Sequence, residues 1–295
     1  MNNHKEHQQA KLVSWSYWLR HRRDPKPQFL IIGEPLKEWR KHVDNFFKHT
    51  KFGKKLLEQL NDPEPFVIIF RGAVRKGKTT AAIVLADWIN NTILGYDLKI
   101  KDYLKYDPQD LFMQMFTLEG LEFPKNLMDK AELESFLKTL KEKVEKGYSF
   151  KYLQACWVQD EAPITLNPEG HHVEDEVHDL NSLFSIRGIT LANLFLTGVS
   201  QRTLADILPQ AQHILRMIKR GTADWKYTYE KDGKRNVNIG DNFITQTFPP
   251  LCAELANELK QPELLSKLEI VTEILAKRAK RLARQHKKPA KKANF

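Results

Sequence analysis

The sequence predicts an α/β fold in which a mainly parallel sheet is covered by helices on both faces. Three observations support this prediction. A glycine-rich loop lies between a buried apolar strand and a helix. Apolar strands and amphipathic helices then alternate along the chain, as they do around parallel sheets. Two of these strands end in polar or charged side chains, and parallel strands bring such ends together at one edge of the sheet.

The composition is typical of a globular protein, with 41% hydrophobic and 28% charged residues in a chain of 295. The longest apolar stretches, such as Phe66–Phe70, have the length of a strand, and none approaches the roughly 18 residues of a membrane span. The N-terminus is polar and lacks the apolar core of a secretory signal. Two cysteines are too few for a disulfide framework. We therefore expect a cytoplasmic protein without a membrane span.

Residues 1–62 are expected to form a leader to the main domain. Phe29–Ile32 has the character of a short strand, and Pro35–Leu60 that of a helix. Aromatic and basic residues interleave in Trp15–Arg23, which leaves two alternatives open. The segment stacks on unpaired bases while its cations neutralise phosphates, or its aromatic rings pack on the main domain.

Residues 63–250 carry the alternating pattern and are expected to form one domain. Helical periodicity follows the glycine-rich loop, and a charged helical insertion is expected at about 117–147. The predicted strands of the sheet are Phe66–Phe70, Leu98–Tyr106, Tyr152–Gln159 and Leu191–Val199. The predicted helix after the loop is Thr79–Ile93, and a late hairpin joins Trp225–Glu230 to Asn236–Phe248.

Residues 251–295 are expected to form a C-terminal helix that runs into a basic tail. The net charge of the chain is +10, and nine lysines or arginines without an acid lie between Lys277 and Lys292. The rest of the chain is therefore nearly neutral. A block of this kind indicates an arm or a solvated helix end that contacts polyanions, with a purely solubilising role as the alternative.

The segment Gly72–Thr79 fits the phosphate-loop pattern G-x-x-x-x-G-K-[ST]. Its glycines let successive backbone N–H groups point at a phosphate, and the helix behind them adds a favourable dipole. Lys78 is expected to reach the β- and γ-phosphates, and the Thr79 hydroxyl to bind Mg²⁺. The residues predicted to bind the nucleotide are Gly72, Ala73, Val74, Arg75, Lys76, Gly77, Lys78, Thr79 and Thr80.

The strand Tyr152–Gln159 ends in two carboxylates, Asp160 and Glu161. Asp160 is expected to hold Mg²⁺, and Glu161 to polarise the water that attacks the γ-phosphate. An acid directly after the magnesium-binding aspartate, with a strand inserted between the two motifs, is the pattern of RecA-like (ASCE) P-loop ATPases. The sequence therefore predicts that fold.

The second polar strand end follows Leu191–Val199 and reads Ser200-Gln201-Arg202. Gln201 is expected to sense whether a γ-phosphate is present. Ser200 and Thr197 are neighbours that could be confused with it.

The spacing of the phosphate loop, Asp160-Glu161-Ala162 and Ser200-Gln201-Arg202 resembles the HerA/FtsK superfamily of DNA-pumping ATPases. The chain is most similar to the short ATPases of archaeal plasmids and viruses, over roughly residues 63–250. It departs from that pattern at Ser200, where threonine is common, and at Thr203, where proline often follows the arginine.

The resemblance implies a homo-oligomeric ring, usually a hexamer, that moves duplex DNA through a central pore with ATP and Mg²⁺. Partners in a capsid or a transfer machinery belong to the same expectation. Such rings complete each site with an arginine from the neighbouring subunit. Arg187 is the favoured candidate, and the others are Arg202, Arg216 and Arg220.

The predicted function is a magnesium-dependent ATPase motor that translocates or packages DNA for a virus or plasmid, in the cytoplasm of the cell or host. No Asn-Lys-x-Asp guanine motif is present, which favours ATP over GTP. One alternative is an ATP-switched assembly or morphogenesis factor with the same fold, although such factors usually carry a membrane helix. A DNA-binding adaptor with a vestigial phosphate loop is another, and the intact Lys78, Thr79, Asp160 and Glu161 argue against it.

Overall fold

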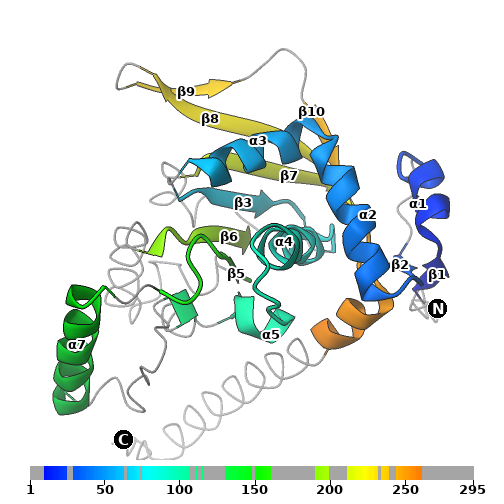
Figure 1. The fold of residues 1–295 in the computed structure, drawn as a ribbon. Coiled ribbons are helices and arrows are strands. Elements are labelled where there is room, and N and C mark those ends of the chain that lie inside the picture. The colour runs from blue at the N-terminus through cyan, green and yellow to red at the C-terminus, as the bar shows by residue number, and fades with distance from the viewer. Residues whose placement is uncertain are drawn as a thin grey trace, which may run out of the picture.

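The structure is a computed structural model whose centre is an eight-stranded mixed sheet (Figure 1). The strand order is β10-β8-β7-β3-β6-β5-β4, and β9 pairs with β8 outside this path. The structure describes residues 10–24, 29–62, 65–73, 75–106, 111, 114–115, 130–147, 150–160, 190–198, 211–231, 234–238 and 244–260.

Five strands form the parallel part of the sheet, and β6 lies between β3 and β5. The strand β3 leads into the phosphate loop, and β5 leads into Asp160. These two strands are therefore not neighbours, because β6 separates them. This order is that of RecA-like (ASCE) sheets and confirms the predicted fold class. The bounds are β3 (Val67–Arg71), β4 (Leu104–Lys105), β5 (Cys156–Gln159), β6 (Asn193–Gly198) and β7 (His213–Lys219).

Both faces of the central strand are covered. Successive side chains of a strand point to opposite faces, and all four residues from Val67 to Phe70 are fully buried. Two amphipathic helices, α2 (Leu36–Lys48) and α3 (Lys51–Asn61), lie on the Phe70 face. The Phe248 ring joins them to the sheet, because it contacts Phe47 of α2, Phe52 of α3 and Phe70 itself.

The helix after the phosphate loop is α4 (Lys78–Asp87), which contacts β3, β5 and β6. It continues as a π-helix, η1 (Trp88–Ile93), where a single α-helix was predicted. In η1 the Asn90 side chain donates to the Cys156 carbonyl (2.9 Å) and accepts from the Cys156 N–H (2.7 Å). β4 pairs only with the last two residues of β5, so Asn90 takes the place of a strand partner at the start of β5.

A buried ion pair joins α2 to α4. The Arg40 guanidinium binds both carboxylate oxygens of Asp87, with Nε to Oδ2 at 3.0 Å and a terminal nitrogen to Oδ1 at 2.9 Å. Asp87 is fully buried and also accepts from Asn91 (2.8 Å). The bidentate geometry compensates the cost of burying this carboxylate.

The first part of the leader packs on α2, a helix of the same leader that lies against the sheet through Phe47 and Phe248. Its strands β1 (Lys11–Val13) and β2 (Leu30–Ile32) form a parallel pair, with α1 (Trp15–His21) between them. Trp15 and Trp18 are buried, and both contact the Phe46 ring of α2. Of the two alternatives for the aromatic residues of this segment, the structure therefore supports packing, with α2 of the leader as the direct partner of the two rings and the sheet in the same buried core.

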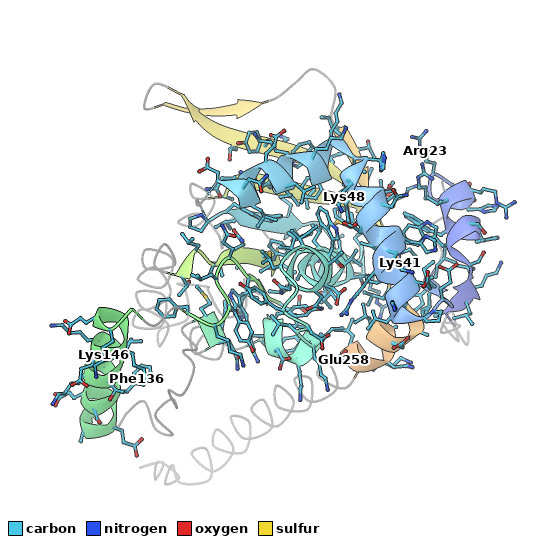
Figure 2. The ribbon with its side chains drawn as sticks, in the orientation of Figure 1. Arg23, Lys41, Lys48, Phe136, Lys146 and Glu258 are labelled. Carbon is cyan, nitrogen blue, oxygen red and sulfur yellow. The ribbon has the colours of Figure 1, made fainter. Side chains whose placement is uncertain are left out.

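The predicted strand Leu98–Tyr106 is wrong over most of its length. A short helix, α5 (Ile100–Tyr103), occupies the middle, and only Leu104 and Lys105 join the sheet. One tertiary contact and one local cap favour the helix. The Ile100 N–H donates to the distant Glu258 (2.7 Å), and the Lys99 N–H donates to Asp102 in the first turn (2.9 Å). Figure 2 shows Glu258 beside α5, on the helical residues 253–260.

Two further strands also differ from the prediction. Residues 151–154 form a turn with Gln154 in the left-handed region (φ 60°), so β5 begins only at Cys156. The late hairpin pairs β8 with two separate strands rather than one. The bounds are β8 (Thr222–Lys231), β9 (Lys234–Asn238) and β10 (Ile244–Thr247).

Within the predicted insertion the structure describes α7 (Lys130–Glu145), which Figure 2 shows at the periphery with Phe136 and Lys146 labelled. Residues 117–129 of that insertion and the basic tail lie outside the described residues. Among the described helices, none has the length and apolar character needed to cross a bilayer.

Candidate nucleotide-binding site

Two glycines of the phosphate loop are required by the backbone. Gly72 has φ 137°, and a Cβ there would lie 2.8 Å from the carbonyl oxygen of Met217 on β7. Gly77 has φ 81° and forms the N-cap of α4. Arg75 also adopts a left-handed conformation (φ 65°). The loop therefore curls tightly over the carboxyl end of β3.

The Lys78 ammonium group lies over this loop. Its Nζ donates to the carbonyl oxygens of Gly72 (3.1 Å) and Ala73 (3.2 Å). A lysine held by loop carbonyls can exchange them for phosphate oxygens, which are stronger acceptors because they carry charge. The half-buried Lys76, Thr79 and Thr80 surround it in sequence.

The Thr79 hydroxyl donates a 2.8 Å hydrogen bond to Oδ1 of Asp160, which follows β5. Thr197 of β6 donates to the same oxygen. Asp160 is buried, and its backbone N–H donates to the Lys105 carbonyl of β4 (3.0 Å). Three strands and the loop helix thus meet at one carboxylate. The fold is that of a RecA-like P-loop ATPase.

The side chains of this P-loop site fit a magnesium ion. Mg²⁺ prefers oxygen ligands and is usually bound through one or two carboxylates together with substrate phosphates. The Thr79 hydroxyl and the Asp160 carboxylate supply such oxygens beside the phosphate loop. In the described part of the chain no group of three or more His, Cys, Asp or Glu forms a separate metal cluster.

Arginines gather on the β7 side of the loop. Arg71, the last residue of β3, is the register partner of Arg216 in the middle of β7. Burial, and then the charge of Arg216, lower the pKa of Arg71. The Nε atom of Arg71 is buried and has no hydrogen-bond partner among the described residues. Burial also lowers the pKa of Arg220, in the turn after β7. This side of the loop is therefore positively charged and favours an anion.

The structure places Lys78 over the carbonyl oxygens of Gly72 and Ala73, and Thr79 against Asp160. The other described residues of the predicted site, which are Arg75, Lys76, Gly77 and Thr80, lie in the same loop and the first turn of α4, and nucleotide binding by all of these residues stays a prediction. Four predicted site residues, Val74, Glu161, Arg187 and Gln201, lie outside the described residues, and their roles stay predictions. Arg220, one of the alternative arginine candidates, lies against Gly77 of its own chain.

Sequence reasoning named Thr197 only as a neighbour of Gln201 and missed its contact with Asp160. The register of β5 against β6 predicts the contact between Thr197 and Asp160. Because Gln159 is the register partner of Leu196, the residue after each partner lies at the same level of the sheet. Those residues are Asp160 and Thr197. Finding them required the knowledge that β5 and β6 are adjacent.

No family model and no curated protein matches this chain. Among solved structures, the chain is similar to the ORC2 protein of Aeropyrum pernix in its ADPNP and ADP complexes, with 13% identity and a TM-score of 0.36. That match covers 63% of this chain and 48% of the other. A second match is to the HORMA:CdnC:Trip13 complex of E. coli MS115-1, with 12% identity, a TM-score of 0.30 and 63% of each chain covered. The chain spans less than two thirds of either protein.

Proposed function

We propose that this protein is a magnesium-dependent ATPase motor that translocates or packages DNA for a virus or plasmid. The observation that carries the ATPase part is the contact of Thr79 with Asp160 beside the Lys78 loop. This set supplies a cation for the β- and γ-phosphates and two oxygen ligands for Mg²⁺.

In the proposed reaction, the chain holds and orients ATP rather than reacting covalently with it. Mg²⁺, when bound, supplies positive charge that neutralises the developing charge on the phosphate oxygens. Lys78 leaves the loop carbonyls and contacts the β- and γ-phosphates. Thr197 keeps the Asp160 carboxylate turned toward Thr79. Glu161 accepts a proton from the attacking water, and Gln201 contacts the γ-phosphate.

The DNA part of the proposal rests on the resemblance to HerA/FtsK ATPases and on the distribution of basic residues. Nine cations occupy the tail between Lys277 and Lys292. A second basic stretch, without an acid, runs from Lys11 to Arg23 and includes the exposed Arg20 and Arg23. Both stretches suit the phosphate backbone of DNA. We further propose a homo-oligomeric ring, with six subunits in analogy to that superfamily, in which Arg187 reaches the neighbouring site.

ATP hydrolysis by the purified full chain, with and without duplex DNA, tests this function. Lys78→Ala is expected to weaken ATP binding and abolish turnover. Glu161→Gln is expected to keep ATP bound while hydrolysis falls by about 10²–10⁴. Displacement of a triplex-forming oligonucleotide from duplex DNA measures translocation directly.

The alternative is an ATP-switched assembly factor. Hydrolysis that DNA does not stimulate, together with an intact triplex, would favour that alternative. Wild-type turnover in Glu161→Gln would contradict the assignment of the water-polarising residue.

A further inference from the structure

The turn between β7 and β8 connects the phosphate loop to the leader. On the leader side, Lys219 donates to the backbone carbonyls of Arg23 and Asp24. The Arg220 guanidinium carbon lies 4.1 Å from the centroid of the Phe29 ring. The leader therefore reaches the nucleotide site through this turn.

On the other side, the same turn touches the loop. A Cβ built on Gly77 would lie 3.5 Å from Cγ of Arg220 and 3.7 Å from the backbone nitrogen of Gly221. The turn itself is fixed, because Gly221 is left-handed (φ 69°) and its carbonyl accepts from the Phe248 N–H at 2.8 Å. Arg220 is thus held between the phosphate loop and Phe29.

The position of the magnesium ligands gives the direction of a bound nucleotide. Thr79, Asp160 and Thr197 meet on the side of β3 that faces β6 and β5, so the terminal phosphates belong there. β7 lies on the opposite side of β3. The sugar and base are attached to the other end of the triphosphate chain, and they extend toward β7. The first side chains on that side of Gly77 are those of the β7–β8 turn.

The chemistry of Arg220 and Phe29 suits a base. Phe29 is 41% exposed, so part of its ring is accessible to a ligand beside the Arg220 contact. Arg220 is half-buried in the turn, and no carboxylate within the described residues forms an ion pair with it. Aromatic rings and planar guanidinium groups both stack on nucleobases.

We infer that Arg220 and Phe29 form the nucleoside end of the site and stack on the base of the bound nucleoside triphosphate. This inference rests on the proposed ATPase function. It assigns a residue of the leader to the nucleotide site, and it gives Arg220 a role within its own subunit rather than in a neighbouring one.

Isothermal titration with Mg-ATP and with magnesium tripolyphosphate separates base contacts from phosphate contacts. Arg220→Ala and Phe29→Ala are expected to weaken ATP binding by about 5- to 160-fold, the range of one lost stacking contact. Tripolyphosphate binding is expected to stay within about twofold of wild type. Phe29→Trp retains a stacking surface, so it is expected to bind ATP normally and to change its fluorescence with ATP but not with tripolyphosphate. Leu12→Ala, which truncates another exposed apolar side chain of the leader, is the matched control.

Equal ATP affinity in Arg220→Ala, Phe29→Ala and wild type would overturn this inference alone. An equal loss of affinity for ATP and for tripolyphosphate would also overturn it, because Arg220 and Phe29 would then affect binding through the phosphate loop and not through the base. Failure of the wild-type protein to bind either ligand would instead refute the proposed function. If Phe29→Ala does not fold, the tryptophan variant and Arg220→Ala still decide the question.

Discussion

The indole N–H of Trp225 donates a 3.0 Å hydrogen bond to Nδ1 of His213. Since Nδ1 accepts this bond, the ring proton of the neutral imidazole is on Nε2, which hydrogen-bonds to Gln59 of α3. His213 is fully buried, and burial, with a smaller effect of Lys55, lowers its pKa to about 3. The hydrogen bonds therefore select a neutral histidine that ties β7, β8 and α3 together.

This histidine makes stability depend on pH. Below pH 6.5, the ordinary pKa of histidine, His213 binds a proton in the unfolded chain. In the folded protein it does not bind that proton until the pH falls to about 3. The free energy of unfolding should therefore fall as pH is lowered through this window. Between pH 7 and pH 5 we expect wild type to lose about 2 kcal/mol more than His213→Asn in urea unfolding. His49→Asn, at an exposed position after α2, should keep the wild-type slope; equal slopes for wild type and His213→Asn would contradict the prediction.

The Arg40–Asp87 pair predicts a large effect from removal of one partner. Arg40→Ala leaves a fully buried carboxylate without its cation, and we expect a loss of about 3–5 kcal/mol in urea unfolding. Adding Asp87→Asn should recover part of this loss, because the buried charge is gone. Lys41 lies on the exposed side of the same helix and pairs with Glu38 at 2.8 Å (Figure 2). Lys41→Ala should cost less than about 1 kcal/mol, and a similar cost for both alanine variants would argue against the buried pair.

Thr197 is expected to act as a positioning residue for Asp160. Thr197→Val removes the hydroxyl and keeps the shape, so the carboxylate loses one of its two threonine donors. We expect the Mg²⁺ concentration for half-maximal ATP hydrolysis to rise by about 10- to 100-fold. Thr197→Ser should restore the wild-type value, and Thr245→Val, at an exposed site on β10, should not change it. An unchanged magnesium dependence in Thr197→Val would refute this role.

The basic tail is expected to contribute sequence-independent DNA binding. Deletion of everything after Leu275 removes the nine cations and should weaken affinity for duplex DNA. With half of those charges engaged, the slope of log affinity against log salt should become less steep by about four. Hydrolysis without DNA should be retained, because Lys78, Thr79 and Asp160 are untouched. Identical affinity and slope for both proteins would assign DNA contact to the core instead.

A shared site predicts complementation between two inactive variants. In a mixed ring of Arg187→Ala and Glu161→Gln subunits, some interfaces keep both an intact Arg187 and an intact Glu161. ATP hydrolysis should therefore reappear on mixing, because an arginine supplied by a neighbour is worth about 10³–10⁵ in rate in other phosphoryl-transfer systems. Light scattering with ATP and DNA gives the assembly state. A monomer at every concentration would exclude the ring.

Local features of the chain were sufficient to predict the fold class and the loop. The loop glycines Gly72 and Gly77 could be predicted from the sequence, because their backbone angles exclude most other residues whatever the fold of the rest of the chain. The buried strands β3 and β6 could be predicted because an apolar run indicates a buried strand even when the neighbouring strands are not known. The prediction of a strand at Leu98–Tyr106 was wrong for the opposite reason. Its local pattern suits a strand, but Glu258, more than 150 residues away in sequence, holds Ile100 in a helix.

Only the tertiary structure decided which side chains meet. Periodicity tells which residues of a strand share a face, but not which strand lies beside it, because that depends on the order of the sheet. The contact of Thr197 with Asp160 exists because β6 lies next to β5. Arg220 reaches Gly77 because β7 lies next to β3. The chain alone determined a phosphate loop with its acid, and the packing of the sheet determined which hydroxyl contacts that acid and which arginine lies against the loop.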